Sequence, residues 1–111
     1  MKFFDSQLFS NFFDTQEIID KESDIVLYSI TTKDNLLLSL YVSPHGHVAI
    51  LSLKTHNTST PIVELNISNL ATITCDNDHL YFYKEQRTNQ ALEKAFLVVK
   101  VKPNVVINFD L

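Results

Sequence analysis

The stretch that most constrains the fold of this chain runs from Leu36 to Val42, where aliphatic side chains recur at every second position. A period of two is that of a β-strand, because successive side chains of a strand point to opposite faces of the sheet. The even-numbered residues of this stretch therefore share one apolar face, which we expect to lie in a core. The opposite face carries Leu37, Ser39 and Tyr41.

Comparable apolar runs, separated by polar turns, continue to the end of the chain and predict an antiparallel sheet. Between two of these runs, residues 88–94 are expected to form one or two helical turns. A bend longer than a two-residue hairpin is expected at Pro103-Asn104, because proline cannot adopt the positive φ that such hairpins favour. The other strands are expected at Ile25–Ile30, His47–Leu53, Pro61–Ile67, Leu70–Cys75, His79–Lys84, Ala95–Lys102 and Val105–Phe109.

The first 23 residues follow a different period, because aromatic and aliphatic residues recur every four positions at Phe4, Leu8 and Phe12. This spacing predicts a helix. A second helix is expected to begin at Asp14, whose carboxylate is placed to cap it, with Phe13 and Ile18 forming a hydrophobic staple across the cap. We expect one α+β domain over residues 1–111, with N-terminal helices (1–23) packed on an antiparallel sheet of seven or eight strands (24–111).

The chain has a single glycine, Gly46, and this excludes several classes of enzyme. Phosphate-binding loops, dinucleotide fingerprints and nucleophile elbows each need two or more glycines. The segment around it, Ser43–Ile50, reads S-P-H-G-H-V-A-I and predicts a proline-initiated turn between two strands. Across such a turn the two histidines diverge, so we expect no metal at the group His45, His47 and His56, although an H-x-H pair on one strand could chelate.

Cys75 and His79 are the pair of residues most typical of an enzyme. If Asp76-Asn77-Asp78 is a three-residue hairpin loop, their side chains become cross-strand neighbours, close enough for a thiolate–imidazolium dyad. The alternative is a small buried cysteine beside a turn histidine. No third orienting group is evident, and the neighbouring aspartates raise the pKa of a thiol. We therefore expect no catalytic residues and no cofactor.

The formal net charge of −4 is confined to residues 1–24, which contain six acidic and two basic residues. The remaining 87 positions balance seven acids against seven bases. An acidic segment without Lys/Arg clusters argues against nucleic-acid binding and suits a basic protein partner, although solvated acidic surfaces are common. The residues expected to contact this partner are Asp14, Glu17, Asp20, Glu22 and Asp24, with Asp76 and Asp78 as a smaller second patch.

Cys75 is the single cysteine and cannot form an intrachain disulfide, and the sequence shows no secretory signal and no apolar run long enough to span a membrane. These features predict a cytoplasmic protein. A small acidic α+β chain with almost no glycine and no catalytic motif resembles the immunity proteins of bacterial contact-dependent growth inhibition and related polymorphic toxin systems. The resemblance covers the whole chain as a profile and involves no motif. It implies a non-enzymatic protein that binds a cognate toxin, often a basic nuclease, and occludes its active site.

Two alternatives stay open from the sequence. One is a generic interaction or adaptor domain that uses sheet edges or aromatic contacts, and the other is a small hydrolase that uses Cys75 and His79. An unprotected edge strand at Val105–Phe109 would also favour a homodimer or the addition of a partner's strand.

Overall fold

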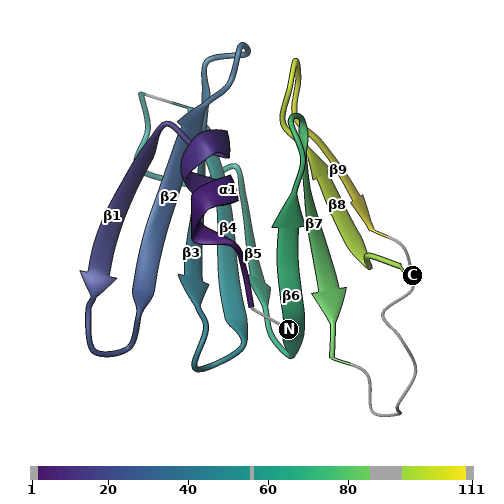
Figure 1. Ribbon diagram of the computed structural model, residues 1–111. Helices are drawn as coiled ribbons and strands as arrows, with labels where there is room; N and C mark the ends of the chain where they lie inside the picture. The colour runs from purple at the N-terminus through teal and green to yellow at the C-terminus, as the bar shows by residue number, and fades with distance from the viewer. Residues whose placement is uncertain (1–2, 56, 86–93, 110–111) are drawn as a thin grey trace.

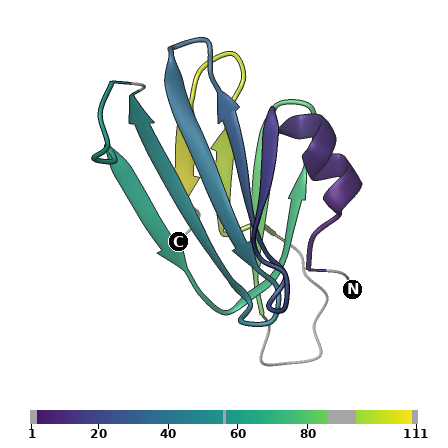
Figure 2. The same ribbon diagram turned by 90° about the vertical axis from the view of Figure 1, so that its left-hand side faces the viewer.

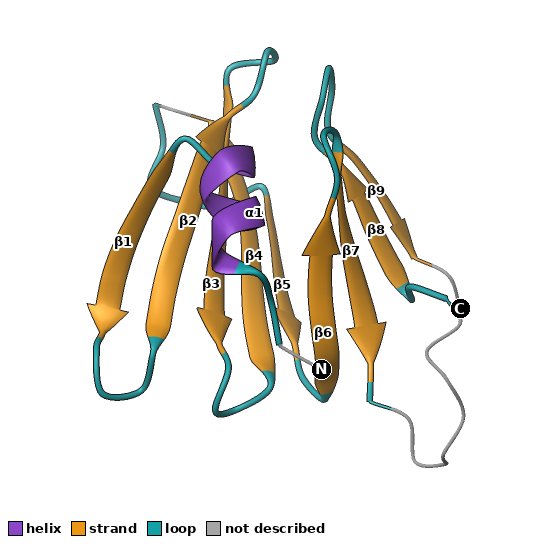
Figure 3. Ribbon diagram, in the orientation of Figure 1, coloured by secondary structure: helices purple, strands orange, loops and turns teal. Residues whose placement is uncertain are grey.

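The computed structural model describes residues 3–55, 57–85 and 94–109, and within these ranges it contains one helix and nine strands in two antiparallel sheets (Figure 1, Figure 3). Helix α1 spans Ser6–Phe12. The five-stranded sheet has the order β1 (Thr15–Asp20), β2 (Ile25–Thr31), β3 (Leu36–Ser43), β4 (Val48–Thr55) and β5 (Val63–Ile67). The four-stranded sheet has the order β6 (Leu70–Cys75), β7 (His79–Lys84), β8 (Leu97–Lys100) and β9 (Val106–Phe109).

Helix α1 closes the opening between the two sheets (Figure 1). Asp5 caps it, because its carboxylate accepts hydrogen bonds from the backbone N–H groups of Gln7 (3.0 Å) and Leu8 (3.3 Å). Phe12 is buried, as the four-residue period predicts, and so is Phe9, but Leu8 of the same period is 46% exposed and Phe4 precedes the helix. A helix this short is marginal on its own, so burial of these rings against the sheets supplies most of its stability.

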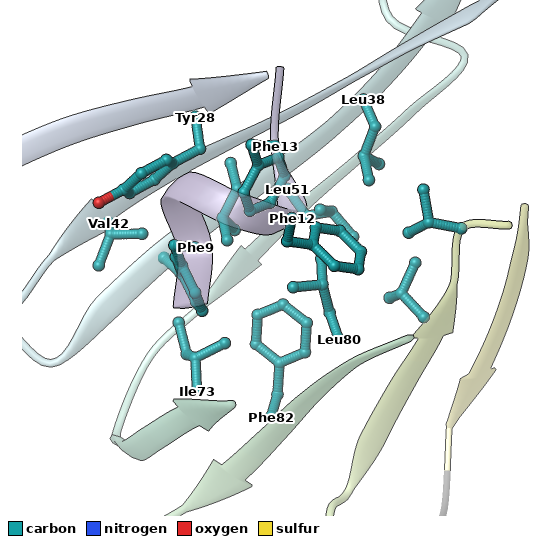
Figure 4. Close-up of a cluster of buried hydrophobic side chains, with 14 of the residues drawn as sticks. Phe9, Phe12, Phe13, Tyr28, Leu38, Val42, Leu51, Ile73, Leu80 and Phe82 are labelled. Atoms are coloured by element: carbon teal, nitrogen blue, oxygen red, sulfur yellow. The ribbon is translucent and has the colours of Figure 1, made fainter. Parts of the chain in front are cut away.

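The core lies between the inner faces of the two sheets and is closed by an aromatic cluster under α1 (Figure 4). The ring of Tyr28 on β2 lies 5.2 Å from that of Phe9 and 5.3 Å from that of Phe13. Each large apolar side chain that is fully buried contributes about 1.5–3 kcal/mol. The hydroxyl of Tyr28 is buried and has no hydrogen-bond partner among the described residues.

The two sheets join at a tight corner between β5 and β6. Asn69 has a positive φ of 55°, which redirects the chain so that β6 pairs with β7. The backbone N–H of Leu70 donates to the carbonyl of His47 (3.0 Å), which holds the corner against the β3–β4 turn. The N-terminal segment closes the other side, because the carbonyl of Phe3 accepts a hydrogen bond from the N–H of Ile73 (2.8 Å).

The expected α+β architecture is wrong, because the structure is mostly β and its strands form two sheets. The predicted second helix from Asp14 is strand β1. The residue before Asp14 ends α1 in an extended conformation, and the N–H of Asp14 then donates to the carbonyl of Ser29 on β2 (2.9 Å). Three of the six residues of β1 are β-branched, namely Thr15, Ile18 and Ile19, which favours a strand.

The expected strands are otherwise present with shifted ends, and the buried positions of β3 are Leu38, Leu40 and Val42, as the alternation predicts. Pro103-Asn104 lies in the longer bend expected between β8 and β9. The helical turns expected at 88–94 lie outside the described residues except for Lys94, which belongs to no helix or strand.

Candidate functional site

The first acidic group lies at the end of β1, in the turn that leads to β2, and collects Asp20, Glu22 and Asp24. The carboxylate of Asp20 builds this turn, since it accepts hydrogen bonds from the backbone N–H of Glu22 (3.1 Å) and from the hydroxyl of Ser23 (3.2 Å). All three acidic side chains are exposed. The structure thus brings together three of the five N-terminal acids predicted to contact a partner.

Asp24 links this turn to the β3–β4 turn that carries the glycine. Its carboxylate lies 3.1 Å from Nε2 of His45, and both side chains are about two-thirds exposed. Asp24 itself has a positive φ of 56°, a backbone conformation that aspartate and asparagine tolerate better than most residues. An ion pair this exposed contributes little to stability, so its carboxylate is available to a partner.

The other two N-terminal acids lie apart from that turn. Asp14 lies at the opposite end of β1, where its carboxylate accepts a hydrogen bond from the backbone N–H of Thr31 (3.1 Å). Glu17 lies in the middle of β1, opposite Leu27 of β2, and is exposed. The expected surface is therefore one edge of the five-stranded sheet, extended along β1, and not the face of a helix.

The second acidic patch is a different kind of structure. The carboxylate of Asp76 accepts hydrogen bonds from the backbone N–H groups of Asp78 (2.9 Å) and His79 (2.8 Å) and from the hydroxyl of Tyr81 (2.6 Å). These bonds, that from Tyr81 foremost, lower the pKa of Asp76 well below its usual range. The same contact raises the pKa of Tyr81 to about 12. Asp76 is thus occupied within its own turn, whereas the side chain of Asp78 is exposed.

Cys75 and His79 do not form the dyad considered from the sequence. Cys75 pairs with Leu80, so the turn is one residue longer than a three-residue loop and the two side chains point to opposite faces of the sheet. Burial and the nearby Asp76 carboxylate raise the pKa of the Cys75 thiol, which disfavours the thiolate. Nδ1 of His79 lies 3.2 Å from a carboxylate oxygen of Asp76, and its ring stacks on Tyr81.

The histidines of the S-P-H-G-H turn also point apart, as predicted. The turn spans Pro44 to His47, and the N–H of His47 donates to the carbonyl of Pro44 (3.2 Å). His47 itself, and not Gly46, has the positive φ (54°), and its Nδ1 lies 2.8 Å from the carboxylate of Glu85. His56 lies outside the described residues. In the parts of the chain that are described, no three His, Cys, Asp or Glu side chains gather as metal ligands do.

The feature missed from the sequence is the outward face of the five-stranded sheet. Apolar side chains from three strands gather there into a group that we call the Tyr41 patch, and a depression of about 190 Å³ opens beside Tyr41. The signal was present in the β3 run, where Leu37 and Tyr41 alternate with the core leucines, so that both faces of the strand carry apolar side chains. The patch consists of Ile25, Leu27, Tyr41, Val48 and Ile50.

The corresponding face of the four-stranded sheet differs in charge. A shallow pocket of about 340 Å³ is lined there by Tyr81 and Tyr83 together with Lys94 and Phe109. Lys100, opposite His79, adds a second cation to this face. The four-stranded face thus carries mixed charge, whereas the Tyr41 patch is bordered by the acidic residues of β1 and the β1–β2 turn.

Taken together, these features define a mostly β protein of two antiparallel sheets, with an acidic edge strand beside an apolar face that no other described part of the chain covers. The fold is similar to that of a chain in the contact-dependent growth inhibition toxin–immunity protein complex from Klebsiella pneumoniae 342, with a TM-score of 0.69. The match covers 98% of this chain and 96% of that chain, so the two share a fold, and at 16% sequence identity the likeness is one of fold alone. The resemblance expected from the sequence is thus confirmed at the level of the fold.

No known protein family matches the sequence, and no curated protein matches it. In the described ranges, no helix is long and apolar enough to cross a membrane.

Proposed function

We propose that this chain is a cytoplasmic immunity protein, which neutralises a cognate toxin domain by binding it and occluding its active site. One observation carries the proposal, namely the likeness of fold, over nearly the whole of both chains, to a chain of a toxin–immunity protein complex. The proposal concerns a protein–protein contact and involves no chemical step in this chain.

Between the two roles in such a complex, the residues favour the inhibitor. The pair most suited to catalysis is separated, because Cys75 faces inward and the ring of His79 is engaged by Asp76 on the other face. Glycine-dependent phosphate sites are excluded by the composition. A chain whose described residues assemble no nucleophile with a base is better suited to block an active site than to supply one.

The charge of the chain indicates the chemistry of the partner. A toxin that cleaves nucleic acid needs cations to hold phosphates, and carboxylates complement such a surface. We propose that Asp20, Glu22 and Asp24, together with Glu17 on β1, face those cations. Asp14 and Asp78 are proposed as more distant contributors, whereas Asp76 is mainly a turn-forming residue.

The test is a pair of growth experiments in Escherichia coli. We expect the gene immediately upstream of this chain to encode a large secreted protein, and the C-terminal domain of that protein is the candidate toxin for the test. Expression of the chain alone should leave growth unchanged, and its co-expression with the toxin domain should restore growth. Growth arrest by the chain alone would assign it the toxin role, and equal killing with and without the chain would refute the immunity role.

A binding measurement then tests the electrostatic part of the proposal. The association rate of the two purified proteins should fall steeply as salt is raised, because exposed charges are screened within about 8 Å at physiological ionic strength. An association rate independent of salt would count against the acidic surface while leaving the immunity role intact.

A further inference from the structure

The outward face of the five-stranded sheet is not covered by any other described part of the chain. Figure 2 looks onto this face, with the four-stranded sheet behind it and α1 to one side. The inner face of the same strands is fully buried at Leu38, Leu40 and Leu51. Sheets that expose one face to water normally carry polar residues there. An apolar group on that face therefore needs an explanation.

The Tyr41 patch is continuous across the strands. Cross-strand pairs place Glu17, Leu27, Tyr41, Ile50 and Asn66 in one row that crosses all five strands. The centre of this row is apolar and its two ends are polar. This arrangement matches the apolar centre and polar rim of protein–protein interfaces, in which tyrosine is enriched.

Tyr41 is the most suitable anchor within the patch. Its side chain is 37% exposed although it lies on a central strand, and the depression beside it is bounded by Ile25, Val48 and Ile50. A tyrosine supplies a large apolar area at low entropic cost, and a partner side chain can fill the adjacent depression.

The patch ends sharply on one side. The next row across the sheet consists of Ser29, Ser39, Ser52 and Glu64, and the hydroxyls of Ser29 and Ser39 lie 3.4 Å apart. The apolar group is therefore confined to the end of the sheet that carries the Asp20–Asp24 turn. Its position is what a localised docking surface requires.

The charges around the patch indicate its occupant. Glu17 lies opposite Leu27, Asp20 lies opposite Ile25, and Asp24 directly precedes Ile25. Ile19 lies at the bulge of β1 and is 47% exposed, which adds exposed apolar area on this edge strand. Lys21 in the turn is the nearby counter-charge. The rim is net negative and complements a partner with cations around an apolar centre.

A second copy of this chain is a poorer occupant, because a two-fold contact through the patch would bring two acidic rims together. The four-stranded face is also a poorer site for a basic partner, since Lys94 and Lys100 lie on it. From these observations we infer that the Tyr41 patch and its acidic rim form the surface on which the basic face of the toxin domain docks. This inference rests on the proposed function and assigns the contact to one face of the molecule.

Matched substitutions on the two outward faces test the inference. Tyr41→Thr removes the proposed anchor, and Tyr83→Thr is the control, because both tyrosines lie on central strands and threonine suits a strand. Affinity for the upstream-encoded toxin domain, measured by surface plasmon resonance, should fall at least tenfold for Tyr41→Thr, mainly through faster dissociation. Tyr83→Thr should change it less than twofold.

The charged rim has its own pair of variants. Glu17→Lys should slow association several-fold at low salt and lose most of that effect at high salt. Asp34→Lys, a matched charge reversal in the exposed β2–β3 turn, should change the association rate little. Circular dichroism and thermal melts check that each variant is folded. Sedimentation of the wild type alone reports on self-association.

The outcomes separate the inference from the proposed function. Protection and binding by the wild type, with loss confined to Tyr41→Thr and Glu17→Lys, supports both. If the wild type protects but Tyr41→Thr binds as well as the wild type, or if only Tyr83→Thr loses binding, the docking surface is overturned. The immunity role is then unaffected. Disruption of a dimer by Tyr41→Thr without an effect on toxin binding assigns the patch to a second copy. Failure of the wild type to bind or protect overturns both.

Discussion

The two acidic turns, Asp20–Asp24 beside the five-stranded sheet and Asp76–Asp78 beside the four-stranded sheet, look alike in the sequence but differ in the structure. Asp76 receives hydrogen bonds from its own turn and from Tyr81 on the following strand, and its pKa is lowered as a result. In the other turn, Asp20 likewise accepts hydrogen bonds within its turn, but Asp24 forms an exposed pair with His45 and the side chain of Glu22 is exposed. The Asp20–Asp24 turn therefore presents two exposed carboxylates that its own hydrogen bonds do not use, Glu22 and Asp24, whereas the Asp76–Asp78 turn presents one, Asp78.

The two turns differ in how readily their carboxylates can bind a partner. A carboxylate that several donors already satisfy offers less to a partner, because a new contact must replace existing hydrogen bonds. A carboxylate in an exposed ion pair loses little when the pair is exchanged. The Asp20–Asp24 turn is therefore the better candidate for binding, and the Asp76–Asp78 turn the better candidate for stability.

The largest expected effect follows from removing the Asp76 carboxylate. Asp76→Ala leaves two backbone N–H groups and the Tyr81 hydroxyl without their acceptor and should lower the free energy of unfolding by about 2 kcal/mol. Urea denaturation measures the change. Asp78→Ala in the same turn is the control and should change stability by less than ~0.5 kcal/mol. Equal effects of the two variants would remove the distinction between the carboxylates.

Acid should weaken the contribution of Asp76 selectively. Its pKa in the folded protein lies below that of the unfolded chain, about 3.9, so its contribution is complete above that pH and is lost as the pH falls further. The stability difference between the wild type and Asp76→Asn should therefore shrink on going from pH 7 to pH 3. Denaturation curves at each pH give this difference, and a constant value would show that the charge of Asp76 is immaterial.

A smaller effect is expected at the other end of the same hydrogen bond. Tyr81→Phe removes the donor and should cost about 1 kcal/mol near neutral pH. Because the pKa of Tyr81 is raised to about 12 from an ordinary value near 10, its contribution is present below pH 10 and is lost between pH 10 and 12. The phenolate absorbance of the wild type minus that of Tyr81→Phe should titrate near pH 12. A difference curve centred at pH 10 would contradict the contact.

Some of this architecture could be predicted from the sequence because it depends on local periodicity. The alternation in β3 correctly placed Leu38, Leu40 and Val42 in the core. The four-residue spacing correctly predicted a helix with Phe12 buried, although Leu8 of the same spacing is 46% exposed. Both signals reflect burial of one face of an element, which the sequence records directly.

The errors arose where an element has no buried face or where partners are distant in the chain. All six residues of β1 are exposed, so the segment has no apolar periodicity that marks it as a strand. The capping signal at Asp14 therefore predicted a helix in spite of the β-branched residues, and pairing with β2 makes the segment a strand. The division into two sheets depends on the corner at Asn69, and the length of the turn after Cys75 decided which residue faces the core. The Tyr41 patch needed the register of three strands, which no single segment encodes.

The smallest effect on stability is expected at Asp24, in the Asp20–Asp24 turn. Its comparison with Asp76 is the most direct test of the difference between the two turns. Asp24→Asn keeps a residue that tolerates the positive φ and removes only the exposed ion pair with His45. The free energy of unfolding should change by less than ~0.5 kcal/mol.

The association rate of Asp24→Asn with the toxin domain should nevertheless fall measurably at low salt, because the lost charge belongs to the proposed rim. His45→Gln removes the partner and leaves the carboxylate, so it should not slow association. If Asp24→Asn destabilised the chain as much as Asp76→Asn does, without slowing association, Asp24 would be a second structural aspartate and the rim would have to be drawn without it.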